Sequence, residues 1–168
     1  VVGPGDHTDR FTYWVERLQR GGDIVCPPDA EFAVDWIDVR DLCHWLIRLA
    51  ENDTPGVFNA TAPGQVVSRE QFMWGLRLCA TEQSTLHWPT RELVEALEFP
   101  TPMFYNPPYS IHADSSAAQK AGLTFTAFAD TVRDTHEWWM SQSAERRANP
   151  RRWPTQEQEA AVIAKSAG

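Results

Sequence analysis

Short extended stretches alternate with amphipathic helical stretches along this 168-residue chain. Residues 8–20 place apolar side chains at the i, i+3, i+4 and i+7 spacing of one helix face. A strand is expected at 23–27, and an extended run at 31–37 leads to Asp38, which suits the N-cap of another helix. We expect the inner face of that helix to consist of Val39, Leu42, Cys43, Leu46 and Ala50. The alternation predicts an α/β fold.

The middle of the chain continues this pattern. Two further strands are expected, one at 57–61 and a shorter one at 86–88. Between them, Ser68 and Gln71 form a capping box for a helix that runs to about position 80. Thr90 is expected to cap the following helix, which would end at about position 98. Strands and helices therefore keep alternating over this part of the chain.

A proline-rich stretch at 99–109 contains aromatic residues, among them Tyr105 and Tyr109. Each proline removes a backbone donor and fixes φ, so neither a regular helix nor a central strand is expected. Loops of this length in compact domains are often functional, and an aromatic-bearing loop is therefore predicted. Beyond it, Asp114 should cap a short helix and Thr126 should begin a longer one.

Polar and basic residues dominate the stretch 143–152. Its four arginines are Arg146, Arg147, Arg151 and Arg152. They suit either an anion-binding patch or a solvated connector between helices, and the connector is the favoured interpretation. Thr155 and Gln158 then resemble a second capping box, which would open the last helix. We therefore divide the chain into a main part, 1–142, and a basic connector with a C-terminal helix, 143–168.

Charge and composition exclude several classes of protein. The net charge of -8 and the pI near 5.0 disfavour binding to nucleic-acid phosphates, which requires clustered Lys and Arg. Cys26, Cys43 and Cys79 are odd in number and widely spaced, so neither a disulfide framework nor a zinc ribbon is indicated. No apolar run approaches the ~18 residues of a membrane span. We expect a soluble, cytoplasmic chain without a nucleic-acid or membrane partner.

The opening segment VVGPGDHT has the order of strand end, GxG and helix with which a dinucleotide-binding fingerprint begins. Thr8 takes the place of the third glycine, and Pro4 removes an N–H that would face the pyrophosphate. Asp6 puts a carboxylate where a phosphate would lie. The segment is therefore a poor candidate for a dinucleotide site.

Recognised catalytic and metal-binding motifs are missing from the sequence. Ser116 and Ala161 stand four positions before Lys120 and Lys165, the only lysines, so there is no Tyr-x-x-x-Lys pair. The five histidines form no HxxxH or HExxH pattern, and no metal site is expected. There is also no GxSxG or Walker motif. We assign no catalytic residue to this chain.

Four segments occur in a consistent order, GPGDHTDRFTYWVERLQRGG, DWIDVRDLCHWLIRLAE, GVFNATAP and FTAFADTVRDTHEWW. Together they resemble the C-terminal part of extended short-chain dehydrogenase/reductases, the NAD-dependent epimerase/dehydratase family. Members of this family have a Rossmann domain with a glycine-rich loop and a Tyr-x-x-x-Lys pair, and the resemblance places both before Val1. It implies a Rossmann-type fold with its cofactor half absent. It also implies NAD or NADP in the complete protein and no tight binding of either by this chain alone.

The resemblance implies a set of site residues as well. Gly3 and Pro4 would lie beside the nicotinamide end of the cofactor. The substrate cleft would be lined by Asp9, Arg10, Phe11, Tyr105 and Tyr109. The stretch 99–109 would lie over that cleft. For Asp9 a second interpretation stays open, because acidic residues near the first turn also stabilise a helix N-terminus through its dipole.

One departure from the family pattern narrows the expected substrate. UDP-sugar epimerases of this family carry an arginine and a histidine where this chain has Val34 and Asp38. A second phosphate-binding arginine, expected shortly before Asp114, is also missing from this sequence. Without these charge-assisted contacts a diphosphate loses its anchor. The resemblance therefore favours a small substrate other than a nucleotide sugar.

Two hypotheses follow. In the first, the chain is the substrate-binding portion of an NAD(P)-dependent oxidoreductase or epimerase-like protein and is inactive as this fragment. In the second, it is a non-catalytic binding or assembly module on a reductase scaffold, which pairs with itself or with a separate cofactor-binding chain. Both predict an exposed apolar face where the missing half would dock.

Overall fold

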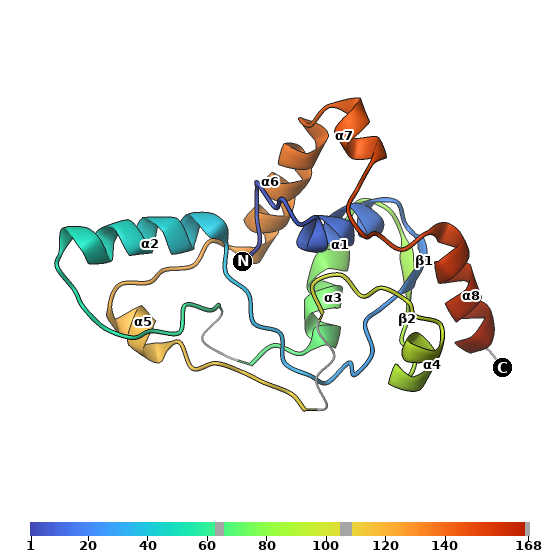
Figure 1. Ribbon diagram of the computed structural model, residues 1–168, viewed down its shortest axis with the longest axis horizontal. Coiled ribbons are helices and arrows are strands. Elements are labelled where there is room, and N and C mark those ends of the chain that lie inside the picture. The colour runs from blue at the N-terminus through green and yellow to red at the C-terminus, as the bar shows by residue number, and fades with distance from the viewer. Residues whose placement is uncertain (63–65, 105–108, 167–168) are drawn as a thin grey trace.

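A computed structural model describes residues 1–62, 66–104 and 109–166 of the chain (Figure 1). Two short parallel strands, β1 (Gly22–Val25) and β2 (Ser84–His87), lie in the body of the molecule. Their register pairs Gly22 with Ser84 and Val25 with His87. Both strands were expected, with bounds shifted by one to two residues. The architecture is mixed α/β with a short parallel sheet, as the alternation of elements predicts.

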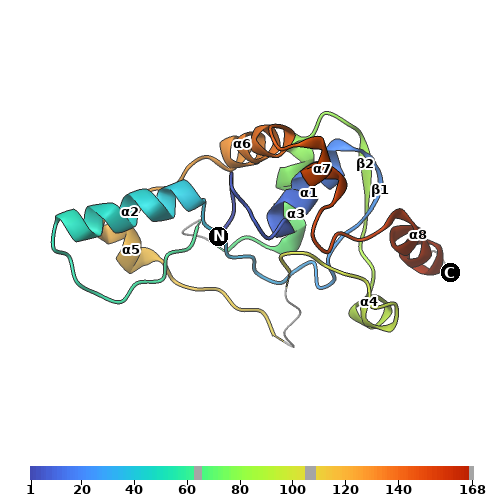
Figure 2. The ribbon, with the colours of Figure 1, turned by 45° about the horizontal axis from the view of Figure 1, so that its top comes forward.

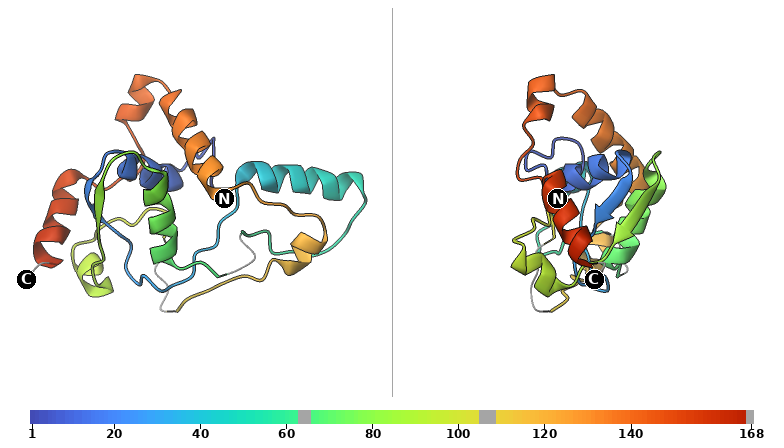
Figure 3. Two further views of the ribbon diagram at one scale, coloured as in Figure 1. Left: turned by 180° about the vertical axis from the view of Figure 1, so that it is seen from behind. Right: turned by 90° about the vertical axis from the view of Figure 1, so that its right-hand side faces the viewer.

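Helices α1 (Arg10–Gln19), α3 (Arg69–Cys79) and α6 (Phe128–Met140) enclose the main core beside the sheet (Figures 1 and 3). Phe72 of α3 lies at the centre of an aromatic cluster. Its ring centroid is within 6.3 Å of those of Phe11, Trp36, Phe104 and Phe128. The rings meet at steep angles, and burial of such large aromatic surfaces is a major source of stability. The core therefore joins segments from both ends of the chain.

The C-terminal helix α8 (Gln156–Ser166) packs against β1 and α4 (Arg91–Ala96) at one end of the molecule (Figure 1). This smaller core contains Val25, Val94, Phe99 and Val162. The Glu159 carboxylate accepts hydrogen bonds from Arg17 Nε at 2.8 and 2.9 Å, and both side chains are buried. A buried ion pair thus fixes α8 to α1.

Helices α2 (Val39–Glu51) and α5 (Ser116–Lys120) form an arm that extends from the body on the side away from β1 and β2 (Figures 1 and 2). Trp45 is the buried residue of α2. Its indole Nε1 donates to the carbonyl oxygen of Ala121 at 3.0 Å, and its ring packs edge-on against Phe58. The arm therefore has a small core of its own.

The predicted inner face of α2 is wrong. Val39 and Leu42 are partly buried, but Cys43, Leu46 and Ala50 are exposed. The side of the helix that carries Trp45 packs on Phe58 and the residues after α5, and no described element covers the side that carries Leu46. The helix was predicted correctly, but the direction in which its apolar residues point was not.

The extended stretches form fewer strands than the sequence suggests. The prediction of a strand at 57–61 is wrong, because Val57 is fully exposed and these residues pair with no strand in the described part of the chain. The run at 31–37 contributes only isolated bridges, one of them between Trp36 and Ala62. Neither stretch pairs with β1 or β2.

Most predicted helix caps are confirmed. The confirmed caps are Asp38, the Ser68–Gln71 box, Thr90 and the Thr155–Gln158 box. Asp114 accepts from the N–H of Ser116 at 2.8 Å, although the N-cap residue of α5 is Ser115. The prediction for Thr126 is wrong, because α6 begins after Ala127. The N–H and the hydroxyl of Thr126 both donate to Asp41 of α2, each at 2.7 Å.

Candidate functional site

The carboxylate of Asp6 closes the N-terminal end of α1. One oxygen accepts hydrogen bonds from the backbone N–H groups of Phe11 and Thr12, at 3.0 and 3.1 Å. The other accepts from the N–H and the hydroxyl of Thr8. Burial by itself would raise the pKa of Asp6, but these hydrogen bonds outweigh it and hold the pKa below its usual value. A side chain of the protein thus occupies the helix terminus where a dinucleotide would place phosphate.

Asp9 precedes α1 and is fully buried, with a left-handed backbone at φ 59°. Its carboxylate pairs with Arg146 of the short helix α7 (Ala144–Ala148). The same carboxylate accepts from the backbone N–H of Arg151 at 2.8 Å. The carbonyl oxygen of Asp9 accepts from the indole of Trp153 at 3.0 Å. Asp9 therefore fixes the connector between α6 and α8 to the start of α1.

A cavity of about 610 Å³ lies where the start of α1, the proline-rich loop and this connector meet. It is lined by Thr8, Arg10, Pro100, Thr101, Pro102, Met103, Phe104, Arg151 and Arg152. We call it the arginine cavity. Its volume falls within the range of roughly 300–1,000 Å³ typical of small-molecule sites. No acidic side chain is among the described residues that line it.

The structure brings together only some of the predicted substrate-cleft residues. Arg10 and the first residues of the stretch 99–109 meet in the arginine cavity. Phe11 lies in the core with 1% of its surface exposed, and Tyr109 is 61% exposed outside the cavity lining. Tyr105 falls outside the described residues. Their roles in substrate binding stay predictions.

Of the two residues predicted to border the cofactor, Gly3 lies beside Asp38. Gly3 is buried at φ 112°, and a Cβ at this position would stand 3.3 Å from Asp38 Oδ1. Pro4 is partly buried in the turn that follows. A glycine is therefore required at position 3 by its backbone conformation and by the close carboxylate. Contact with a cofactor stays a prediction for both residues.

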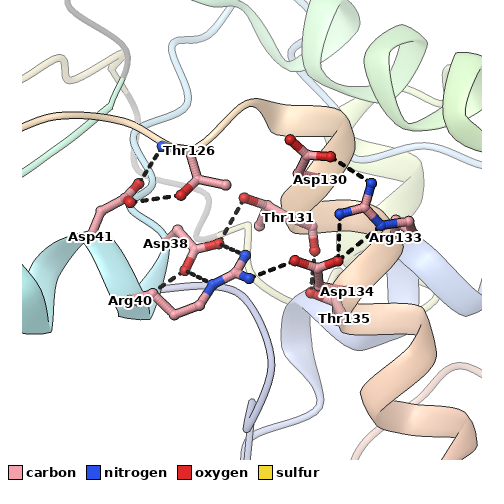
Figure 4. Close-up of polar contacts among 9 residues, drawn as sticks. All are labelled: Asp38, Arg40, Asp41, Thr126, Asp130, Thr131, Arg133, Asp134 and Thr135. Carbon is pink, nitrogen blue, oxygen red and sulfur yellow. Dashed lines mark hydrogen bonds and ion pairs between the residues drawn. The ribbon is translucent and has the colours of Figure 1, made fainter.

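Asp38 itself is the centre of a polar network that joins α2 to α6 (Figure 4). Its carboxylate accepts from Arg40 Nη2 at 2.6 Å and from the Thr131 hydroxyl at 2.7 Å. Arg40 Nη1 also donates to Asp134 at 2.5 Å. Burial by itself would raise the pKa of Asp38, but the hydrogen bonds from Arg40 and Thr131 keep it below its usual value. The network ties the arm to the body of the molecule.

Sequence reasoning did not connect Arg151 and Arg152 with Arg10. The four arginines of the connector divide into two pairs, of which Arg146 and Arg147 lie in α7. Arg151 and Arg152 line the cavity together with Arg10, about 140 positions earlier in the chain. The available signal was a basic run in an acidic chain. Spacing along the sequence does not show which distant residue such a run will meet.

The described residues contain no group of three or more His, Cys, Asp or Glu side chains arranged to hold a metal ion. Among residues 1–62, 66–104 and 109–166, no helix combines the length and the apolar character that crossing a membrane requires. The arginine cavity is the candidate site because three arginines and an apolar wall meet in it.

Comparison with known proteins defines the class of fold. No family model and no curated protein matches the sequence. Among solved structures, the chain is similar to a structure described as a novel NAD-dependent NDP-hexosamine 5,6-dehydratase, TunA, involved in tunicamycin biosynthesis. The TM-score is 0.56 at 22% sequence identity, over 85% of this chain and 44% of that one. At this identity the likeness shows the fold alone, and the chain spans less than half the length of the enzyme it resembles.

Proposed function

We propose that this chain is the substrate-binding portion of an NAD(P)-dependent oxidoreductase or epimerase-like protein that acts on a small substrate other than a nucleotide sugar. The fold is the observation that carries the proposal, because 85% of the chain matches part of an NAD-dependent dehydratase. The short parallel sheet and its flanking helices are consistent with part of a Rossmann-like fold. The arginine cavity supplies a space in which a small molecule would bind.

In the complete protein, NAD or NADP would transfer hydride from a nucleotide-binding half that precedes Val1. A tyrosine of that half would donate the proton, and a lysine beside it would lower the pKa of that tyrosine. The residues of this chain would bind and orient the substrate. Because the sequence contains no Tyr-x-x-x-Lys pair, the isolated chain would be inactive.

An exposed apolar stripe on α2 supports the proposal that a further part of the protein packs against this chain. Cys43, Leu46, Ile47 and Ala50 recur at i, i+3, i+4 and i+7 and therefore share one helix face. All four are exposed, with Leu46 at 50% and Ile47 at 57%. The N–H of Val2 also donates to Ile37 at 2.8 Å in a parallel bridge separate from the β1–β2 sheet. We propose that the nucleotide-binding half extends this bridge and covers the stripe.

The same stripe favours a second candidate function. A non-catalytic module on a reductase scaffold would cover it by pairing with a copy of itself or with a separate cofactor-binding chain. The two candidates differ in where the catalytic pair is encoded. In the first, it lies in the same reading frame as this chain. In the second, it lies in another chain or nowhere in the assembly.

The reading frame upstream of the Val1 codon tests the proposal. The first candidate predicts a glycine-rich phosphate loop followed by Tyr-x-x-x-Lys in frame. The protein expressed from that frame should oxidise NADH or NADPH with a carbonyl substrate, and a Tyr→Phe change in the pair should abolish turnover. A stop codon immediately upstream, with a start codon at the chain's own beginning, would favour the assembly module.

A further inference from the structure

The arginine cavity concentrates positive charge in a chain whose net charge is -8. Arg10, Arg151 and Arg152 all line it, and all three side chains are exposed. Among the described residues, none of the three forms an ion pair with a carboxylate. Like charges that line one cavity repel one another, and an anion bound among them would relieve that repulsion.

Two of the four arginines of the connector stabilise the fold, and the other two line the arginine cavity. Arg146 pairs with the buried Asp9, and Arg147 donates to the carbonyl oxygen of Gln142 at 3.3 Å. Arg151 contributes its backbone N–H to Asp9, which leaves its guanidinium at the cavity. Arg152 adopts a left-handed backbone at φ 55°. The fold thus holds Arg151 and Arg152 in place through main-chain geometry and leaves their charges available.

Arg10 lines the cavity from the side formed by the start of α1. Its Nε donates to the hydroxyl of Thr8 at 3.1 Å, and that hydroxyl donates to Asp6 at 2.6 Å. One N–H of the guanidinium is therefore engaged by a neutral hydroxyl, which orients the group without neutralising it. The remaining N–H groups are available to an acceptor in the cavity.

The third wall is apolar and packed. The indole of the buried Trp14 donates to the carbonyl oxygen of Pro102 at 2.5 Å. The ring of Phe104 packs edge-on against Trp14 at 5.4 Å, and Thr101 Oγ1 donates to the Phe104 carbonyl oxygen. Met103 completes this side of the cavity. The wall is thus suited to an apolar group rather than to a second charge.

We propose that the arginine cavity binds a small phosphate ester, with its phosphate held by Arg10, Arg151 and Arg152 and its organic group against Met103 and Phe104. Guanidinium groups bind phosphate through paired N–H donors, and a doubly charged phosphate matches several of them better than a single carboxylate. As a substrate class, a phosphate ester rests on the proposed function. Binding itself is a property of this chain and is measured without any cofactor.

Phenyl phosphate is the probe, and isothermal titration calorimetry on the 168-residue chain is the measurement. We expect saturable one-to-one binding that weakens as salt is added. Inorganic phosphate should bind more weakly because it lacks the organic group, and phenol should not bind because it lacks the charge. In ¹H–¹⁵N spectra, the indole N–H of Trp14 should shift on addition of phenyl phosphate, since it donates to the cavity wall.

Two charge-removing variants test the assignment. Arg151→Gln and Arg152→Asn should each weaken phenyl phosphate binding about tenfold, the typical effect of a lost hydrogen bond to a charged group. Asparagine is chosen at position 152 because it tolerates the left-handed backbone. Arg20→Gln is the matched control, since Arg20 is exposed at the other end of α1 and lies outside the cavity lining. It should leave the affinity unchanged.

Far-ultraviolet circular dichroism checks that each variant is folded. Undiminished binding by folded Arg151→Gln and Arg152→Asn proteins, or equal weakening by Arg20→Gln, would overturn the assignment. Equal binding of phenol and phenyl phosphate would also overturn it. None of these results depends on NAD(P)-dependent turnover, so a failed reductase assay contradicts the proposed function and leaves the phosphate site standing.

Discussion

The backbone N–H of Arg151 donates to the carboxylate of Asp9 over 2.8 Å, joining residues 142 positions apart. Through this bond and the pairing of Asp9 with Arg146, the connector after α6 lies against the start of α1. The arginine cavity exists because of this contact, since its walls come from both segments. The buried carboxylate of Asp9, which directly precedes Arg10, thus brings the distant Arg151 and Arg152 to the same cavity as Arg10.

Asp9→Asn should weaken both folding and anion binding. Asparagine accepts the left-handed backbone at position 9 but removes the charge that Arg146 and the Arg151 amide share. We expect the free energy of unfolding, measured with urea, to fall by about 2 kcal/mol, the scale of a hydrogen-bonded charge. Phenyl phosphate binding should weaken as well.

Asp130→Asn is the control for this change. Asp130 pairs with Arg133 on the surface of α6, and both side chains are about half exposed. Exposed pairs of this kind contribute between 0 and about 1 kcal/mol. Equal loss of stability in the two variants would contradict the role assigned to Asp9.

Glu159→Ala should loosen the C-terminal helix. The substitution leaves Arg17 buried without its carboxylate, a defect that typically costs about 3 kcal/mol or more. Urea unfolding should report this loss, and limited proteolysis should release α8 before the rest of the chain is cut. Glu157→Gln, on the exposed side of the same helix, should lower the free energy of unfolding much less and should leave the release of α8 unchanged. Cleavage of α8 at the wild-type rate in Glu159→Ala would count against the buried ion pair.

The lowered pKa of Asp38 predicts a specific acid dependence. Its pKa is lower in the folded chain than the usual value of about 3.9, because hydrogen bonds from Arg40 and Thr131 outweigh the effect of burial. A lowered carboxyl pKa contributes stability at higher pH, and that contribution is lost as the pH falls through the folded value. Urea unfolding of wild type and Asp38→Asn should therefore converge as the pH falls below about 4.

Thr131→Val removes one of the bonds that lower the pKa of Asp38. The difference in unfolding free energy between this variant and wild type should also shrink as the pH falls. The change should be smaller than for Asp38→Asn. Curves that stay parallel for both variants down to the acid limit would show that Asp38 is not the group responsible.

The apolar stripe on α2 should govern association. We expect the wild-type chain to show an apparent mass that rises with concentration in gel filtration with light scattering, because Leu46 and Ile47 are uncovered. Leu46→Gln with Ile47→Gln should behave as a monomer of unchanged stability. Trp45→Ala, on the buried side of the same helix, should instead cost about 3–5 kcal/mol of folding free energy. A wild-type chain that is monomeric at every concentration would contradict this assignment.

Local signals in the sequence predicted most of the helices. The Ser68–Gln71 and Thr155–Gln158 boxes form as expected because each depends only on residues three positions apart. The beginning of α6 was missed because Asp41, 85 residues away, takes the donors of Thr126. A sequence pattern does not specify which distant group will satisfy a hydroxyl.

The candidate site was predicted in part. Arg10 and the proline-rich loop were expected near a cleft, and they line one cavity. Arg151 and Arg152 were not connected with it, because their position depends on the long-range bond to Asp9. The packing side of α2 was also wrong, because its apolar residues encircle enough of the helix to fit two opposite directions. Long-range contacts, and not local propensities, decide all of these.

Titration of the isolated chain with NADH and NADPH tests most directly where the cofactor binds. We propose that the cofactor binds to a nucleotide-binding half outside this chain, since Asp6 already fills the N-terminus of α1. Phenyl phosphate is kept at a saturating concentration throughout, so that the 2′-phosphate of NADPH cannot occupy the arginine cavity. We expect no saturable binding of either cofactor at concentrations up to about 1 mM. A dissociation constant of that size corresponds to a binding free energy of only about 4 kcal/mol. Micromolar binding of NADH or NADPH by these 168 residues would contradict it.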